Sequence, residues 1–228
     1  LGSFASLIGI QLVRVKEGGK PGPALNAGTV YTCVIFAVFL VVLVLLGGFD
    51  IAARWPRLAG LITGVVIGFT SDFFNGDDRH PVVETAEVSG SGAAINIITG
   101  FSYGLISIVP AVVGIVVAML IAYFTAESSD VINGVYGVAI SAVGMLSISG
   151  MIVSSDAYGP IVDNARGIAE MAGMPEEVID TSDILDAAGN TAKAITKGFA
   201  ISAAALTVLA LFSAYASEIR LATAELGE

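Results

Sequence analysis

Long apolar runs separated by short polar segments dominate the chain. Residues 28–48 carry no charged side chain, and about 20 such residues suffice for a helix to cross roughly 30 Å of hydrocarbon. The same criterion selects four more runs, of which 93–123 is long enough to tilt or to kink at Pro110. The pattern predicts an all-α fold, a polytopic transmembrane helical bundle with five full spans and one partial span: 28–48, 58–74, 93–123, 134–155 and 199–217, with 1–13 as the tail of a further helix.

The composition agrees with a membrane location and excludes several classes of protein. Of the 228 residues, 55% are hydrophobic and 13% are charged, about half the charged share of a soluble domain. A solvated globular enzyme and a disordered chain are therefore excluded. Ten Lys and Arg against twenty Asp and Glu give a net charge of −10, which leaves no basic surface for nucleic acid. The single Cys33 excludes a disulfide framework and a Cys-rich zinc site.

The loops between the predicted spans alternate between the two sides of the membrane, and their basic residues are unequally divided. One side collects seven basic residues and the other collects three. Because basic loops tend to stay in the cytoplasm, the richer side, which includes 156–198, is expected to be cytoplasmic. Its basic residues are Arg14, Lys16, Lys20, Arg79, Arg166, Lys193 and Lys197.

Glycines at helical spacing indicate closely packed helices. Gly60, Gly64 and Gly68 recur every four residues on one helix face, and small residues at this spacing let two helix backbones approach each other in lipid. Packing, with no further function, is the interpretation for these three glycines. The same interpretation applies to Gly100 and Gly104.

Polar residues collect between the last two apolar runs of the chain, 134–155 and 199–217. Eight of the twenty acidic residues lie within 31 positions, 156–186. Asp156, Asp163 and Glu170 are seven residues apart, so they share a helix face. On the next helix a second polar stripe follows at steps of three and four, and Gly173 and Pro175 supply the turn between the two. That second stripe consists of Asp183, Asp186, Asn190, Lys193 and Lys197.

Two interpretations of these stripes remain open on spacing alone. One is a solvated surface loop. The other is a functional site, because ionisable groups deep in a membrane protein are costly and usually mark an ion or substrate path. Carboxylates suit Mg²⁺ that bridges to phosphate oxygens, and lysines suit phosphate as point charges. Carboxylate, amide and ammonium together indicate a site for a metal–phosphate ligand.

The residues of these stripes resemble a known family. The stretches SSDAYGPIVDNARGIAEMAG (154–173) and DILDAAGNTAKAITKGFAISAAAL (183–206) closely resemble the membrane-bound, ion-pumping inorganic pyrophosphatases, and RHPVVETAEVSGSGAAINIITG (79–100) is similar to an earlier loop and helix start of that family. The resemblance covers most of the chain, which is about a third of a typical member. It implies Mg²⁺-dependent hydrolysis of pyrophosphate, coupled to H⁺ or Na⁺ transport through a homodimer in the lipid bilayer.

The resemblance also implies how this chain contributes. Residues 1–228 are expected to form a partial transmembrane pyrophosphatase domain, an internal fragment in which 154–198 is the cytoplasm-facing part of the active site. The family's other aspartate-rich motifs and its ion gate are not found in the chain, so the fragment alone is expected not to hydrolyse pyrophosphate.

Individual roles follow from the motifs that match. By resemblance, Asp163 falls on an aspartate that ligates Mg²⁺ of the substrate complex. Asn190 falls on an asparagine of the active-site funnel, and Lys197 falls on a lysine that contacts the phosphates. Asp156 and Asp186 lie in the matching motifs without an assigned role.

Lys193 and Thr196 bear on the requirement for K⁺. Members that need K⁺ usually carry Ala at the first position, with Gly or Ala three residues later, whereas K⁺-independent members carry Lys and Thr. The sequence KAIT therefore resembles the K⁺-independent class, which is associated with proton pumping. A tethered ammonium can supply the charge of a bound K⁺. The alternative is a lysine that only reaches to the membrane interface.

Two departures from the family pattern leave other functions open. Arg166 stands where Gly is usual, and Ala192 stands where Thr is common. Arg166 either crowds the metal site or pairs with Glu170 one helical turn away. The alternatives to a K⁺-independent proton pump are a Na⁺-pumping pyrophosphatase, a secondary cation transporter or channel without hydrolysis, and an inactive family member.

Overall fold

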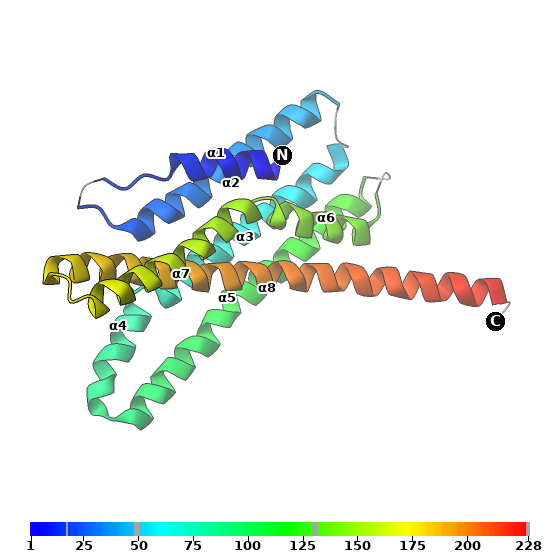
Figure 1. Ribbon diagram of the computed structural model, residues 1–228. Helices are drawn as coiled ribbons and strands as arrows, with labels where there is room; N and C mark the ends of the chain where they lie inside the picture. Colours follow the sequence, from blue (N-terminus) through cyan, green and yellow to red (C-terminus); the bar gives the residue numbers. More distant parts are fainter. Residues whose placement is uncertain (17, 48–50, 130–131, 227–228) are drawn as a thin grey trace.

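The computed structural model is an elongated helical bundle (Figure 1). It describes residues 1–16, 18–47, 51–129 and 132–226, and within these ranges it contains no strand, which confirms the all-α prediction. The α-helices are α1 (Gly2–Leu12), α2 (Pro21–Leu45), α3 (Arg54–Asn75), α4 (His80–Glu87), α5 (Ala93–Glu127), α6 (Gly134–Leu146), α7 (Ser149–Met171) and α8 (Glu176–Leu226). Short 3₁₀ helices, η1 (Ile51–Ala53) and η2 (Val88–Ser91), precede α3 and follow α4.

Most of the predicted spans are found as helices. Four helices are long and apolar enough to cross a membrane: α2, α3 with its continuation to Ser91, α5 and α8. The bent pair of α6 and α7 makes a fifth candidate if it is one span. Pro110 lies inside the continuous helix α5, and the predicted span 199–217 is the middle of the 51-residue helix α8. The partial span 1–13 corresponds to the 11-residue helix α1.

The predicted span 134–155 is found as a bent pair of helices. α6 ends at Leu146, and α7 starts at Ser149 with a bend of 45° between them. At the break the hydroxyl of Ser147 donates to the carbonyl of Val143 at 2.8 Å, a local bond that competes with the helical ladder. The start of α1 packs here, since a Cβ at Gly2 would overlap the Ser147 carbonyl.

α3 lies among α5, α6 and α8 and carries much of the core. Gly60 lies directly against the Ser141 carbonyl of α6. A Cβ at Gly64 would be 2.8 Å from Phe199 Cε2 and 3.2 Å from Met145 Cγ. The packing role predicted for these two glycines is therefore confirmed, and Gly68 makes a looser contact. A Cβ added at Gly104 would meet no atom of another element within 4 Å among the described residues. The predicted close packing is therefore not found at Gly104.

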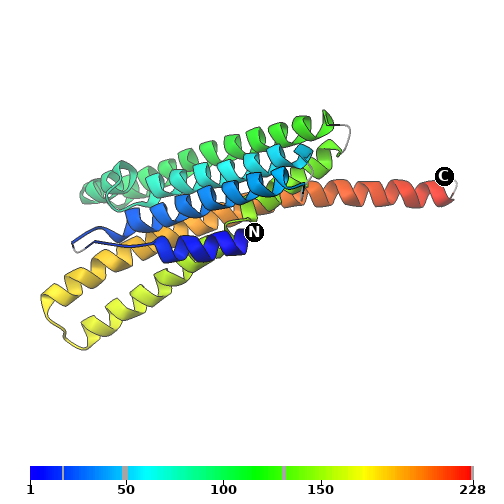
Figure 2. The ribbon, with the colours of Figure 1, turned by 90° about the horizontal axis from the view of Figure 1, so that it is seen from above.

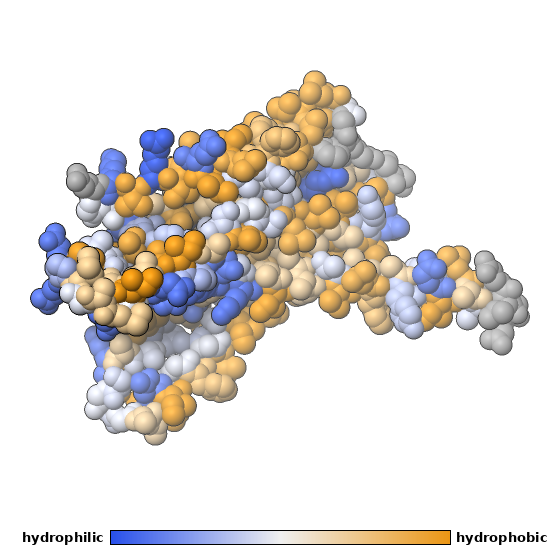
Figure 3. All heavy atoms as spheres, viewed as in Figure 1, coloured by the Kyte–Doolittle hydropathy of each residue, from blue (hydrophilic) through white to orange (hydrophobic). Residues whose placement is uncertain are grey.

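The connections that the sequence assigns to one side of the membrane lie together at one end of the bundle. Figure 2 shows the α1–α2 connection, the α3–α4 turn and the α7–α8 turn at this end, opposite the C-terminus. In Figure 3 hydrophilic residues gather on the α7–α8 hairpin at the same end. The predicted turn is present, because Gly173 adopts a φ of 64° between α7 and α8. All the predicted site residues lie on this hairpin.

Candidate functional site

Two glycines bring the backbones of α7 and α8 together. A Cβ on Gly189 would lie 2.9 Å from the Cα of Gly159 and 2.7 Å from Val162 Cγ2. A real Cβ does not approach that closely, so the two helices cross here at a distance that only glycine permits. The crossing fixes which residues of the two polar stripes meet.

Lys193 lies between two of the predicted site residues. Its Nζ donates a hydrogen bond to Asn190 Oδ1 at 3.2 Å and is 3.8 Å from Asp163 Oδ2. Its aliphatic stem covers Gly159, because a Cβ at that glycine would be 2.9 Å from Lys193 Cγ. The Lys193 side chain is 25% exposed, against 59% for Asp163. The structure therefore brings Asp163, Asn190 and Lys193 into one cluster, in which the stem of Lys193 is packed against α7 and its ammonium reaches the two polar partners.

Thr196 lies one turn from this cluster and contacts both helices. Its hydroxyl is 3.1 Å from the carbonyl oxygen of Ala192 and 3.4 Å from that of Ile152 on α7. A single hydroxyl hydrogen is donated to one of these acceptors at a time. Thr196 is therefore a contact between the helices and does not touch the cluster's charged atoms.

Lys197 stands apart from Lys193 and its partners. It is exposed, and it makes no hydrogen bond or ion pair with any residue that the structure describes. It follows Lys193 by four positions, so both project from the same face of α8. The next residue, Gly198, packs against α3, where a Cβ would lie 2.6 Å from Ser71 Oγ. Among the described residues Lys197 thus offers an ammonium without a hydrogen-bond or ion-pair partner, next to a glycine that packs against α3.

Arg166 points away from Asp163 and ties the two helices together nearer their turn. Its Nε donates to Asp183 Oδ1 at 2.6 Å, and Nη1 donates to Glu170 Oε2 at 2.7 Å. Of the two interpretations of Arg166, the structure confirms the ion pair with Glu170. It also contains an ion pair with Asp183 on α8, which was not predicted from the sequence. The guanidinium is thus bound by Glu170 and Asp183, and among the described residues it makes no ion pair with Asp163.

The acidic residues offer few ligands for a metal ion. Among the described residues no group of three or more His, Cys, Asp or Glu side chains is close enough to hold one. Asp163 is mostly exposed, and the ammonium of Lys193 is its one ion-pair partner among the described residues. Asp186 has a buried Oδ1 without a hydrogen-bond partner. Mg²⁺ commonly binds to one or two carboxylates and takes its other ligands from water and phosphates, so Asp163 fits as one ligand of a metal that arrives with its substrate.

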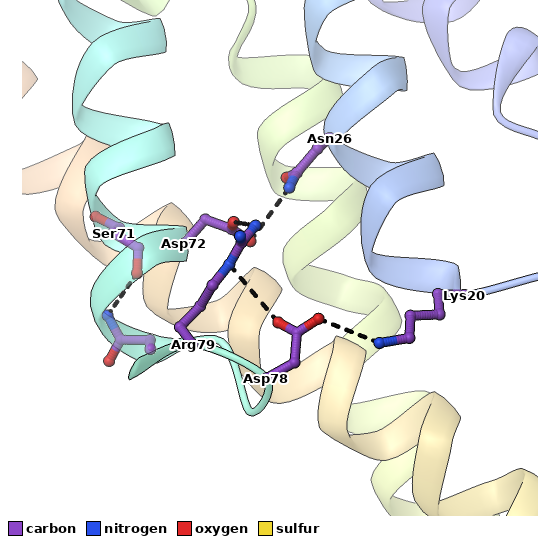
Figure 4. A network of polar contacts seen from close by, with 7 residues as sticks. Lys20, Asn26, Ser71, Asp72, Asp78 and Arg79 are labelled. Carbon is purple, nitrogen blue, oxygen red and sulfur yellow. Dashed lines mark hydrogen bonds and ion pairs between the residues drawn. The ribbon is translucent and has the colours of Figure 1, made fainter. Parts of the chain in front are cut away.

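A second polar cluster lies at the same end of the bundle and was not predicted from the sequence. Asp72 near the end of α3 is 8% exposed and is the one charged residue that is buried in the described part of the chain. Its carboxylate accepts hydrogen bonds from Arg79 Nη2 at 2.8 Å and from Asn26 Nδ2 at 3.2 Å (Figure 4). The only signal in the sequence was an isolated Asp in the apolar run FTSDFF.

Comparison with known proteins decides the family. The model of the family described as inorganic H⁺ pyrophosphatase matches residues 1–228. The chain belongs to this family. Together with its apolar helices, this membership makes the chain part of an integral membrane protein that crosses the membrane several times.

Curated relatives carry names of two kinds. The chain is 43% identical over 234 residues to the K(+)-insensitive pyrophosphate-energized proton pump of Caldanaerobacter subterraneus subsp. tengcongensis, with 96% of this chain and 33% of the relative covered. It is 40% identical over 222 residues to the putative K(+)-stimulated pyrophosphate-energized sodium pump of Clostridium tetani, with 97% of this chain and 33% of the relative covered.

Both relatives are about three times as long as this chain, which spans about a third of their length. The chain is nearly as identical in sequence to the relative named as a sodium pump as to the one named as a proton pump. Overall sequence identity therefore does not distinguish the two kinds of pump. The distinction has to come from particular residues.

Proposed function

We propose that the full-length parent of this chain hydrolyses pyrophosphate to phosphate and couples this reaction to H⁺ transport across a membrane without requiring K⁺. One observation carries the proposal: the ammonium of Lys193 lies between Asp163 and Asn190, where the two polar stripes meet. The residues 154–198 then form the cytoplasm-facing part of the active site, and this chain supplies a part of a longer transmembrane domain that works as a homodimer.

Each side chain has a distinct task in this proposal. Asp163 presents a free carboxylate oxygen to the Mg²⁺ that accompanies pyrophosphate. When bound, Mg²⁺ polarises the phosphoryl oxygens and neutralises the charge that develops there. Lys197 projects an unpaired ammonium that binds and orients the phosphates, and Asn190 fixes the direction of the neighbouring ammonium through its side-chain oxygen. Hydrolysis adds one water across the P–O–P bond, so these residues act by positioning and by charge.

The position of the Lys193 ammonium between two oxygen atoms supports K⁺ independence. Its side chain is three-quarters buried and its charge faces two oxygen atoms, which is the environment that a bound monovalent cation would need. A cation tethered to the helix occupies that space permanently, so added K⁺ has no site to fill. Thr196 holds the next turn of α8 against α7. This pair of residues favours the K⁺-independent class, to which the proton pumps among the relatives belong by name.

The test uses the full-length parent in sealed vesicles, with phosphate release and acidification of the lumen followed after addition of Mg-pyrophosphate. The expected result is hydrolysis with acidification that K⁺ does not change and that a Mg²⁺ chelator abolishes. Lys193→Ala is expected to make hydrolysis dependent on K⁺. Lys16→Ala, which removes an exposed lysine of the α1–α2 connection, is the matched control and is expected to behave as the wild type.

Other outcomes would select the alternatives. Hydrolysis with Na⁺ uptake and without acidification would identify a sodium pump, a function that some relatives carry in their names. Absence of phosphate release under every salt condition would refute the pyrophosphatase and leave a cation transporter or an inactive member. This chain by itself is expected to release no phosphate.

A further inference from the structure

We infer that Asp72, Arg79 and Asn26, here called the α3 clasp, are positioning residues that hold the end of α3 so that Lys197 on α8 is placed for phosphate. None of the three lies on the α7–α8 hairpin that carries the predicted site. The inference deepens the proposed function and rests on the role given there to Lys197.

The buried position of Asp72 requires compensating partners. A carboxylate that leaves water must be paired and hydrogen-bonded to be tolerated. Asp72 is 8% exposed and receives a charged donor, Arg79, and a neutral donor, Asn26. The three residues belong to different elements: α3, the turn before α4, and α2. The carboxylate therefore joins three parts of the chain at one point, as Figure 4 shows.

Arg79 and Asn26 restrain the end of α3 from two different elements. Arg79 reaches back seven residues to Asp72, which closes the α3–α4 turn onto the last turns of α3. Asn26 binds the same carboxylate from α2. The end of α3 is thereby held from both sides and does not depend on the short turn alone.

The contact between α3 and α8 connects the clasp to Lys197. Ser71, next to Asp72 in the chain, faces Gly198, next to Lys197, with so little space that a Cβ at Gly198 would be 2.6 Å from Ser71 Oγ. One turn earlier, Gly68 lies opposite Ile195. Contacts this tight transmit a displacement of one helix to the other. A shift of the α3 end therefore moves the backbone that carries Lys197.

The outer pair of the same network is a matched control. Lys20 Nζ is 3.1 Å from Asp78 Oδ2, but the two side chains are 70% and 54% exposed. Exposed pairs of this kind contribute little to stability. Lys20→Met therefore removes a charge from the same end of the bundle without touching the buried carboxylate.

The experiment measures KM and kcat for Mg-pyrophosphate in the full-length parent carrying Asp72→Asn, Arg79→Lys, Asn26→Ala or Lys20→Met. A displaced ammonium binds the phosphates less well in the ground state and the transition state alike, so KM rises and kcat stays nearly constant. A weakening of the ammonium–phosphate contact by about 1.4 kcal/mol corresponds to a tenfold change in binding, so about a tenfold rise in KM is expected for Arg79→Lys. Asn26→Ala, which leaves the ion pair in place, gives a smaller rise, and Lys20→Met gives none.

A merely structural role predicts a different result. Loss of folded protein lowers the apparent kcat in proportion and leaves KM unchanged, and that outcome in Arg79→Lys and Asn26→Ala would overturn the inference. The double variant Asp72→Asn with Arg79→Gln removes both charges together and provides the test if a single charge change prevents folding. It is expected to keep the raised KM, because a neutral hydrogen bond does not restore the geometry of the guanidinium.

A second readout separates this inference from the proposed function. Spin labels at the exposed positions Phe73 on α3 and Ile201 on α8, in a parent without other accessible cysteines, report the distance between the helices without any hydrolysis. The distance distribution is expected to broaden in Arg79→Lys and to stay as in the wild type in Lys20→Met. If the wild type shows no hydrolysis but the distances respond in this way, the proposed function fails and the clasp is retained. Unchanged distances in Arg79→Lys would refute the clasp.

Discussion

Replacing Gly189 by alanine tests the crossing of α7 and α8 on which the candidate site depends. The added Cβ would lie 2.7 Å from Val162 Cγ2 and 2.9 Å from the Cα of Gly159. The valine methyl can rotate away, but the glycine backbone can move only with its helix. Overpacking of this kind costs about 1–3 kcal/mol. A backbone neighbour places the substitution near the upper end of that range.

The higher helix propensity of alanine partly offsets this loss of stability. Alanine in a helix interior is better than glycine by about 1 kcal/mol. The expected net destabilisation is therefore about 2 kcal/mol, which corresponds to a factor of about 30 in the equilibrium between packed and separated helices. Separation of α7 from α8 lengthens the 3.8 Å distance from Lys193 Nζ to Asp163 Oδ2, so hydrolysis is expected to fall together with stability.

Denaturant unfolding of the full-length parent in detergent gives the change in stability, and phosphate release gives the change in activity. Gly167→Ala is the matched control, since this glycine lies on α7 with no atom of another element within 4 Å of the added Cβ among the described residues. The control is expected to be neutral or more stable by up to about 1 kcal/mol. Equal stabilisation by Gly189→Ala and Gly167→Ala would refute the close crossing, and with it the geometry of the site.

Two further substitutions test other contacts. Arg166→Gly is expected to leave the rate of phosphate release within about twofold of the wild type, because the guanidinium binds exposed carboxylates and such pairs contribute little. Restored activity in this variant of an inactive parent would instead show that Arg166 blocks the site. Gly60→Ala is expected to lower the thermal stability of the parent in detergent, since the methyl would overlap the Ser141 carbonyl of α6. Gly104→Ala on α5 is its control and is expected to be neutral, and equal melting temperatures for the two variants would contradict the packing of α3 on α6.

The positions of the helices and of the polar hairpin could be predicted from the sequence because both depend on local pattern. An apolar run of sufficient length, such as 28–48, forms a helix in lipid wherever its neighbours lie, since every backbone group must be bonded internally. The steps of seven, four and three place Asp163, Asn190 and Lys193 on facing stripes once a glycine turn joins the two helices. The motifs in these stripes also sufficed to assign the family.

The tertiary structure decided which polar groups meet, and this depends on residues that are distant in the chain. Asp72 looks like any isolated acidic residue until Asn26 from α2 and Arg79 from the following turn enclose it. The direction of Arg166 was settled by Asp183 on the neighbouring helix. Hydropathy and periodicity describe a single helix. Burial, ion pairing between helices and the bend between α6 and α7 depend on how several helices pack together. For this reason the sequence determined the helices, the family and the local pair of Arg166 with Glu170, and packing determined the charge partners that lie on different helices.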